Sequence, residues 1–91
     1  MSEPLHRVDI APAAQRQLRR LPPGEAARLR GPILALGIDP RPPGVTKLVG
    51  TDFWRLRVGD LRVVYADEVA RVVVILRVAR RSESTYRRVK G

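Results

Sequence analysis

Residues 53–65 read FWRLRVGDLRVVY, two runs of alternating side chains that flank a Gly-Asp pair. An alternation with a period of two is typical of β-strands that have one buried face and one exposed face. A two-residue hairpin turn needs positive φ angles, which the pair Gly59-Asp60 tolerates. The stretch therefore predicts a β-hairpin, and its turn fixes which residues lie opposite one another.

The predicted register gives the two sides of the hairpin different chemistry. Opposed residues project from the same side of a sheet, so Arg57 and Arg62 share one side with Arg55, which we call the arginine face. The other side receives the core residues Trp54, Leu56, Val58, Leu61, Val63 and Tyr65. Like charges that lie opposite each other destabilise a sheet by roughly 0.2–1 kcal/mol unless an anion or a partner's carboxylate joins them. The arginine face therefore predicts a binding site for a polyanion.

Residues 71–81, RVVVILRVARR, predict a last strand that pairs with this hairpin. A turn centred on Glu68-Val69 puts the odd-numbered residues of that strand, Arg77 and Arg81 included, on the arginine face. The core then also receives Val72, Val74, Leu76 and Val78. A three-residue loop would reverse this assignment, because a shift of one residue exchanges the two faces of a strand.

The rest of the chain predicts a single α+β domain over residues 1–91. Residues 5–10 alternate like a short strand, and Pro12 suits the first turn of a helix that ends near residue 21. A second helix is predicted over residues 24–36, kinked or split at Gly31-Pro32. We therefore expect an N-terminal strand and two helices packed on one face of a small antiparallel sheet. The expected order is strand, two helices, then three strands, with a short C-terminal helix or tail.

Composition limits the classes of function. Eighteen Lys and Arg residues against nine Asp and Glu give a formal net charge of +9, and most of the cations are arginine. Arginine suits bidentate phosphate contacts, so nucleic acid or an acidic protein is the expected partner. The chain has no cysteine and one histidine, His6, so we expect no disulfide, metal or other cofactor. No apolar run is long enough for a membrane span and no apolar leader is visible, so we expect a cytoplasmic protein with no membrane partner.

Five segments together carry a resemblance to a known family. They are the basic helix end at 18–21 with its Leu-Pro, DPRP at 39–42, KLVG at 47–50, RLRVGDLRVVY at 55–65, and LRVARR at 76–81 followed by Tyr86. Over nearly the whole chain they resemble the RelE/ParE superfamily of toxins from type II toxin-antitoxin pairs, which implies a RelE-like fold. RelE-type toxins are ribonucleases that cut the mRNA codon in the ribosomal A site, whereas ParE-type relatives inhibit DNA gyrase. The fold alone does not choose between these functions.

The resemblance to the RelE branch implies catalytic roles for particular residues. That branch alternates two basic residues on one strand, places a third opposite them and a fourth at the end of the last strand, and adds a tail tyrosine. Arg55, Arg57, Arg62, Arg81 and Tyr86 match this pattern. By resemblance, Arg57, Arg62 and Arg81 would bind the scissile phosphate and Arg55 would position a phosphate or base. Tyr86 would stack on a base and take up a proton, or else pack on the core as isolated tyrosines commonly do.

Other basic residues would widen this site, and Arg80 is an alternative to Arg81 at the end of the last strand. The predicted RNA-binding residues are Arg55, Lys47, Arg77, Arg80 and Arg87. Arginines at 55 and 57 replace the lysines of some relatives and cannot readily give up a proton, so no general acid is identified.

The resulting hypothesis is a metal-independent, ribosome-dependent mRNA endonuclease. Its partners would be the ribosome, mRNA and a cognate RelB-like antitoxin that is acidic and amphipathic. The alternatives are a ParE-like gyrase inhibitor, or a non-catalytic module that binds RNA or an acidic peptide. The bland alternative to any site on this face is that its arginines are ordinary strand residues that are only solvated.

Overall fold

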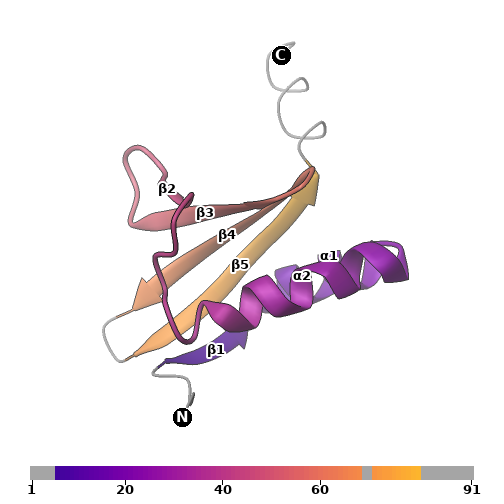
Figure 1. Ribbon diagram of the computed structural model, residues 1–91, viewed down its shortest axis with the longest axis horizontal. Coiled ribbons are helices and arrows are strands. Elements are labelled where there is room, and N and C mark those ends of the chain that lie inside the picture. Colours follow the sequence, from indigo (N-terminus) through magenta and orange to yellow (C-terminus); the bar gives the residue numbers. More distant parts are fainter. Residues whose placement is uncertain (1–5, 69–70, 81–91) are drawn as a thin grey trace.

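The computed structural model of the protein describes residues 6–68 and 71–80. In chain order the elements are β1 (Arg7–Ile10), α1 (Pro12–Arg20), α2 (Pro23–Ala35), β2 (Thr46–Lys47), β3 (Phe53–Val58), β4 (Leu61–Glu68) and β5 (Val72–Arg80). The strands form one sheet in the order β1-β5-β4-β3-β2. Both helices pack on the same side of this sheet (Figure 1). The predicted α+β architecture is therefore confirmed.

The central hairpin has the predicted register. Strands β3 and β4 are antiparallel, and their pairs include Arg57 with Arg62 and Trp54 with Tyr65. Gly59 has a φ of 60°, the left-handed conformation that glycine adopts without steric strain. This tight turn at Gly59-Asp60 holds the register, so the side chains of residues 54–58 and 61–65 fall on the faces that the sequence predicts.

The sheet is mixed, in contrast to the antiparallel sheet that the sequence led us to expect. Strand β1 runs parallel to β5, with Val8 opposite Val73 and Ile10 opposite Ile75. A parallel pair needs a long connection, which the chain after β1 provides through its helices. The sheet also gains the two-residue strand β2, which pairs with β3 and was not predicted.

The register of β5 differs from the predicted one near its start. Glu68 lies opposite Val72, which leaves a loop of three residues and puts Val73 and Ile75 in the core in place of Val72 and Val74. The register then shifts, since Tyr65 lies opposite Ile75 while its neighbour Val64 lies opposite Arg77. The extra residue is Leu76, which makes this a β-bulge. The bulge moves the following residues of β5 to the other side of the sheet. Arg77 therefore lies on the arginine face and Val78 in the core, as the sequence predicts.

Helix α2 continues through Pro32, so the predicted split at Gly31-Pro32 does not occur. A proline inside a helix costs about 3 kcal/mol because it removes a hydrogen bond and crowds the preceding turn. Leu29 and Ile33 lie on either side of Pro32 in the sequence and are both buried against the sheet. Each fully buried aliphatic side chain contributes about 1.5–3 kcal/mol, enough to hold the helix together across the proline.

The hydrophobic core lies between the helices and one face of the sheet. The helices contribute Ala14 of α1, Leu29 and Ile33 of α2, and Leu36 directly after α2. The strands contribute Leu61, Val63, Tyr65, Val73, Ile75 and Val78. The arginine face is the opposite side of the sheet. One side of the sheet is therefore apolar and covered by the helices, and the other side is cationic.

Candidate nucleic-acid interface

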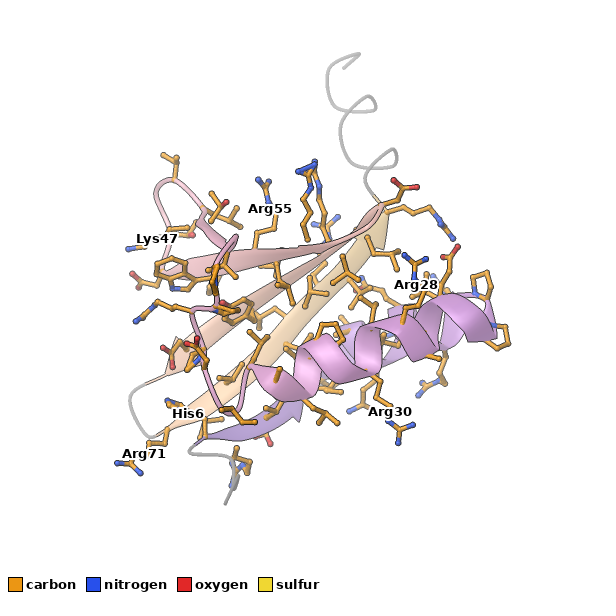
Figure 2. The ribbon with its side chains drawn as sticks, in the orientation of Figure 1. His6, Arg28, Arg30, Lys47, Arg55 and Arg71 are labelled. Carbon is orange, nitrogen blue, oxygen red and sulfur yellow. The ribbon has the colours of Figure 1, made fainter. Side chains whose placement is uncertain are left out.

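Strand pairing places four arginines on the arginine face. One row across the sheet joins Arg57, Arg62 and Ala79, and the next joins Arg55, Val64 and Arg77. Rows two residues apart on a strand are separated by about 7 Å, from a rise of about 3.4 Å per residue. Arg55 projects from the side of the sheet away from α2 (Figure 2). The structure thus brings together Arg55, Arg57, Arg62 and Arg77.

The four side chains differ in their exposure. Arg57 and Arg77 are exposed, whereas Arg55 and Arg62 are half-buried. Within the described residues, Arg55, Arg57 and Arg77 form no ion pair. The carboxylates that do form ion pairs there belong to Asp9, Glu25 and Asp67, and their partners are other residues. An arginine side chain stays protonated at neutral pH and presents donors in a fork that matches phosphate. The arrangement can therefore bind two neighbouring phosphates of a polyanion.

The structure does not bring Arg80 to this face. Arg80 lies opposite Leu61, on the side of the sheet that the helices cover. Its guanidinium donates two hydrogen bonds to Glu25 of α2, with Nη2–Oε1 at 2.6 Å and Nη1–Oε2 at 3.2 Å. A half-buried bidentate pair of this kind fastens α2 to β5. The geometry therefore gives Arg80 a structural role, and it disfavours Arg80 as the alternative to Arg81.

Lys47 is also separated from the arginine face. It pairs with Trp54, so its position falls on the helix side of the sheet, while Thr46 lies opposite Arg55. Lys47 and Arg55 point in different directions (Figure 2). The remaining predicted site residues, Arg81, Tyr86 and Arg87, lie outside the described residues, so their roles stay predictions.

A polar cluster at the end of β3 and β4 was not predicted from the sequence. The Arg41 guanidinium lies over the Trp54 ring at 4.7 Å, and its Nη2 is 3.2 Å from Oδ2 of Asp67. His6 Nε2 is 3.8 Å from Oδ1 of the same carboxylate. The loop segment DPRP is visible in the sequence, but its contact with strands about 15 and 25 residues later depends on the tertiary fold.

Tyr65 gives this cluster a measurable pH dependence. Burial raises the pKa of Tyr65 to about 12, and its hydroxyl donates a hydrogen bond to the carbonyl of Pro40 at 2.5 Å. An unfolded tyrosine ionises near pH 10, whereas the folded protein keeps this proton to a higher pH, so the folded state loses stability as pH rises from about 10 to 12. Two pH units correspond to a loss of about 3 kcal/mol in the free energy of unfolding.

This prediction is checked by urea denaturation at pH 8, 10 and 11.5. The wild-type protein is expected to lose stability across this range, while Tyr65→Phe, which has no ionisable group at this position, is expected to show a flatter profile. Equal slopes for the two proteins would contradict the assignment of the alkaline transition to Tyr65.

Two further classes of site find no support in the described part of the chain. No three His, Asp or Glu side chains of residues 6–68 and 71–80 gather as a metal site requires. Over the same residues, no helix combines the length and the apolar character needed to cross a bilayer.

Comparisons with known proteins agree on one superfamily. The sequence model of the family described as the ParE toxin of the type II toxin-antitoxin system parDE matches residues 8–85. A chain of the archaeal RelE–RelB complex from Pyrococcus horikoshii OT3 is 31% identical, with a TM-score of 0.76 over 88% of this chain and 99% of that one. A chain of the toxin-antitoxin complex RelBE2 from Mycobacterium tuberculosis is 27% identical, with a TM-score of 0.71 over 87% and 100%.

A third structure extends the similarity of fold. A chain of the intact RelBE complex from E. coli has a TM-score of 0.72 over 82% of this chain and 95% of that one, at 22% identity. Comparison with curated proteins found no match. The family match covers most of the chain and the fold agrees with it, so the protein belongs to the RelE/ParE superfamily of toxins from type II toxin-antitoxin systems.

Proposed function

We propose that the protein is a ribosome-dependent endoribonuclease of the RelE type, which cuts mRNA in the ribosomal A site and so inhibits translation in the cytoplasm. The observation that carries this proposal is the row that sets Arg57 directly opposite Arg62, flanked by the row of Arg55 and Arg77. Two arginines directly opposed on one face concentrate positive charge at one place, and an RNA phosphate bound there offsets their mutual repulsion.

The geometry suits the charge that develops when RNA is cleaved. The 2′-hydroxyl loses its proton and attacks the adjacent phosphorus, the bond to the 5′-oxygen breaks, that oxygen takes a proton from solvent, and a cyclic 2′,3′-phosphate remains on the first fragment. Directly opposed Cα atoms in an antiparallel pair lie about 4.5–5.5 Å apart, so the guanidinium groups of Arg57 and Arg62 can hold one phosphate from two sides. Fixed donors aimed at the growing negative charge of the phosphorane lower the barrier.

The other site residues would divide the remaining tasks. Arg55 and Arg77, one row further along the sheet, would bind the neighbouring phosphate and fix the direction of the RNA. Arg81 would complete the set around the scissile phosphate, and Tyr86 would stack on a base and, as the phenolate, take up the 2′-hydroxyl proton. No metal enters this scheme, because the guanidinium groups supply the positive charge.

A ParE-like function is the second candidate, and the match to the ParE toxin family favours it. The family match and the RelE structures thus point to different activities within one superfamily. We favour the RelE activity, because inhibition of gyrase does not require two directly opposed arginines with a second pair of arginines one row away.

An antitoxin would be the natural partner in either case. The similar complexes from Pyrococcus horikoshii and Mycobacterium tuberculosis each join a toxin to its antitoxin. This chain offers an apolar groove of about 410 Å³ between the helices, lined by Leu18, Leu29, Ile33 and Leu34. An amphipathic segment of an acidic, RelB-like antitoxin would fit the groove, and its carboxylates would meet the surrounding arginines.

Two assays in parallel separate the candidates. In a translating extract programmed with one defined mRNA, we expect primer extension to find new 5′ ends in phase with the reading frame. In a supercoiling assay with purified gyrase, we expect no inhibition. Intact mRNA together with inhibited gyrase would establish the ParE-like function instead, and no effect in either assay would favour a non-catalytic binding module.

A further inference from the structure

Only part of β5 has a neighbouring strand on both sides. Strand β1 pairs with residues 72–75 of β5 and ends there. Strand β5 continues to Arg80, and among the described residues no strand follows it on that side (Figure 1). We call residues 76–80 the outer half of β5. It carries Arg77, which lies on the arginine face in one row with Arg55.

The pairing of the outer half of β5 with β4 is interrupted as well, because the bulge at Leu76 lies directly before Arg77. A bulge leaves its extra residue unpaired and disrupts the ladder locally. On the other side of β5, a cavity of about 380 Å³ is lined by the end of α1 and residues 77–80. Close packing against α1 therefore does not by itself fix this stretch.

Two side chains from the helices hold the outer half of β5 where β1 has ended. Gln17 of α1 accepts a hydrogen bond at Oε1 from the backbone amide of Val78 at 2.6 Å. Glu25 of α2 binds the guanidinium of Arg80 through both of its carboxylate oxygens. Val78 follows Arg77 directly, so the Gln17 contact lies one residue away from the arginine face.

The contact of Gln17 is specific to the side on which Arg77 emerges. Along a strand the side chains and the backbone amides both alternate in direction, so the amides that face one edge belong to side chains on one face. The Val78 amide faces Gln17 and the Val78 side chain lies in the core. If β5 slipped by one residue, the Arg77 amide would face Gln17 and the Arg77 side chain would leave the arginine face.

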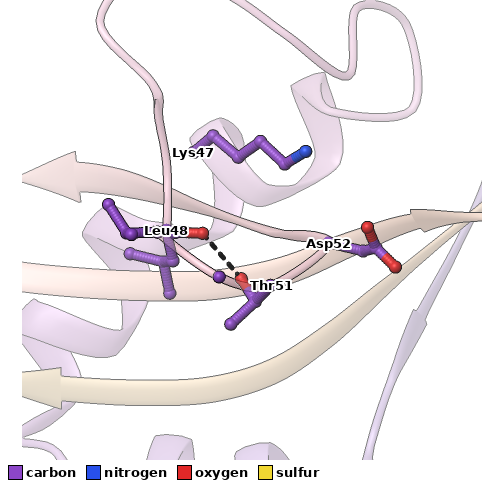
Figure 3. Close-up of a pocket in the computed structure, with 6 residues that line it drawn as sticks. Lys47, Leu48, Thr51 and Asp52 are labelled. Carbon is purple, nitrogen blue, oxygen red and sulfur yellow. Dashed lines mark hydrogen bonds between the residues drawn. The ribbon is translucent and has the colours of Figure 1, made fainter.

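The other arginine of this row is held by strands. Arg55 lies on β3, which pairs with β2 through Thr46 on one side and with β4 on the other. The loop between β2 and β3 is closed by its own hydrogen bonds, since Thr51 Oγ1 donates to the carbonyl of Leu48 at 2.9 Å (Figure 3). Arg55 therefore has a strand on each side, whereas Arg77 has one strand and the contacts from the helices.

We propose that Gln17 and Glu25 are positioning residues for the RNA site, which hold the outer half of β5 in the register that keeps Arg77 on the arginine face. Neither residue touches RNA in this proposal. It rests on the proposed RNA-cleaving function, in which Arg77 and Arg55 bind the phosphate next to the scissile one. Gln17 should have the larger effect, because it contacts the residue directly after Arg77.

The test measures RNA affinity by fluorescence anisotropy, with the full-length protein and a short single-stranded RNA at low salt. The RNA carries 2′-O-methyl groups at every position, so it cannot be cleaved by 2′-hydroxyl attack. Gln17→Leu removes the acceptor but keeps a side chain of similar size. Gln15→Leu is the matched control, because Gln15 lies on the same helix and its Nε2 donates a hydrogen bond of 2.8 Å to the carbonyl of Ile10, in β1 rather than β5.

The proposal predicts that the effects of Gln17 and Arg77 are coupled. Arg77→Ala should weaken binding about tenfold or more, the scale of a hydrogen bond to a charged group. Gln17→Leu should weaken binding about three- to tenfold when Arg77 is present, but less than about twofold in the Arg77→Ala background. Gln15→Leu should stay within about twofold of its parent in both backgrounds, because it is not coupled to Arg77.

Glu25→Ala gives an independent check, because charge and position predict opposite results. The change removes one negative charge, so general attraction alone predicts tighter binding to RNA. Loss of the contact with Arg80 predicts binding that is weaker by about two- to threefold, again only when Arg77 is present. This variant keeps the test decisive if Gln17→Leu does not fold.

Amide hydrogen exchange tests the contact itself. The Val78 amide should exchange faster in Gln17→Leu than in the wild type, while the amides of the buried residues Val73 and Ile75 keep their protection. Gln15→Leu should leave the exchange of Val78 unchanged. Equal protection of Val78 with and without the Gln17 acceptor would overturn the role of Gln17.

No loss of affinity from Gln17→Leu, or an equal loss with and without Arg77, would overturn the proposal, because the helix contact would then not act through Arg77. Tighter binding by Glu25→Ala would overturn the role of Glu25. If Arg57→Ala still lowers the RNA affinity in these cases, the proposed function stands without the positioning residues. If neither Arg57→Ala nor Arg77→Ala changes the affinity, the arginine face is not the RNA site and the proposed function fails as well.

Discussion

Arg57→Ala and Arg62→Ala are each expected to slow mRNA cleavage at least about tenfold, and as much as about a thousandfold, the range seen when a fixed donor to transition-state charge is removed. Both side chains come from the row in which the two arginines lie directly opposite each other. The loss should fall mainly on the rate within the ribosomal complex, because these groups are proposed to bind the charge that grows on the phosphorane. Single-turnover cleavage of a ribosome-bound mRNA measures this rate.

A control with the same change of charge separates catalysis from general attraction. Arg30 of α2 points away from the sheet, so Arg30→Ala removes one positive charge without touching the arginine face (Figure 2). Its cleavage rate is expected to stay within about twofold of the wild type, because exposed charges beyond a Debye length are largely screened at physiological salt. Equal losses of cleavage rate in Arg30→Ala and Arg57→Ala would show that the arginines act only through general electrostatic attraction, which would contradict the proposed site.

Val73→Ala is expected to lower the free energy of unfolding by about 2 kcal/mol, whereas its neighbour Val74→Ala should lower it by less than about 1 kcal/mol. Val73 is fully buried in the core and Val74 is only partly buried on the other face. The buried change removes two methyl-sized groups at about 0.8 kcal/mol each and leaves a small cavity behind. Because 1 kcal/mol shifts the melting temperature of such a domain by about 4–8 °C, thermal unfolding distinguishes the two variants.

This pair of variants also tests the strand register itself. In the register with a turn centred on Glu68-Val69, Val74 would be the core residue and the order of the two effects would be reversed. A larger melting-temperature loss for Val74→Ala than for Val73→Ala would therefore contradict the three-residue loop and the bulge at Leu76.

The hairpin could be predicted from the sequence because all the information it needs is local. The Gly59-Asp60 turn sets the register, and the alternation on either side assigns the faces. Strand β5 could not be predicted in the same way, because a run of consecutive apolar residues from Val72 to Leu76 gives no alternation to follow. Arg77 nevertheless reached its predicted face, since the longer loop and the bulge each exchanged the faces once.

Only the part of the candidate site that lies on strands with alternating side chains could be predicted from the sequence. The arginine face follows from period-two spacing, but the ion pair of Arg80 with Glu25 joins residues 55 positions apart and has no local signal. Lys47 was assigned to RNA from its charge, and the two-residue strand β2 instead sets it opposite Trp54. The contacts of Arg41 with Trp54 and Asp67 depend in the same way on the loop that brings Arg41 to the sheet, which only the folded chain reveals.

The most direct measurement is primer extension on one stalled ribosomal complex that holds a single defined codon in its A site, compared with the same mRNA free in solution. The account predicts a cut within that codon for the wild-type protein, no cut in the free mRNA, and little or no cut with the Arg57→Ala, Arg62→Ala double variant. An intact mRNA in the ribosomal complex, or equal cleavage by the double variant and the wild type, would contradict it.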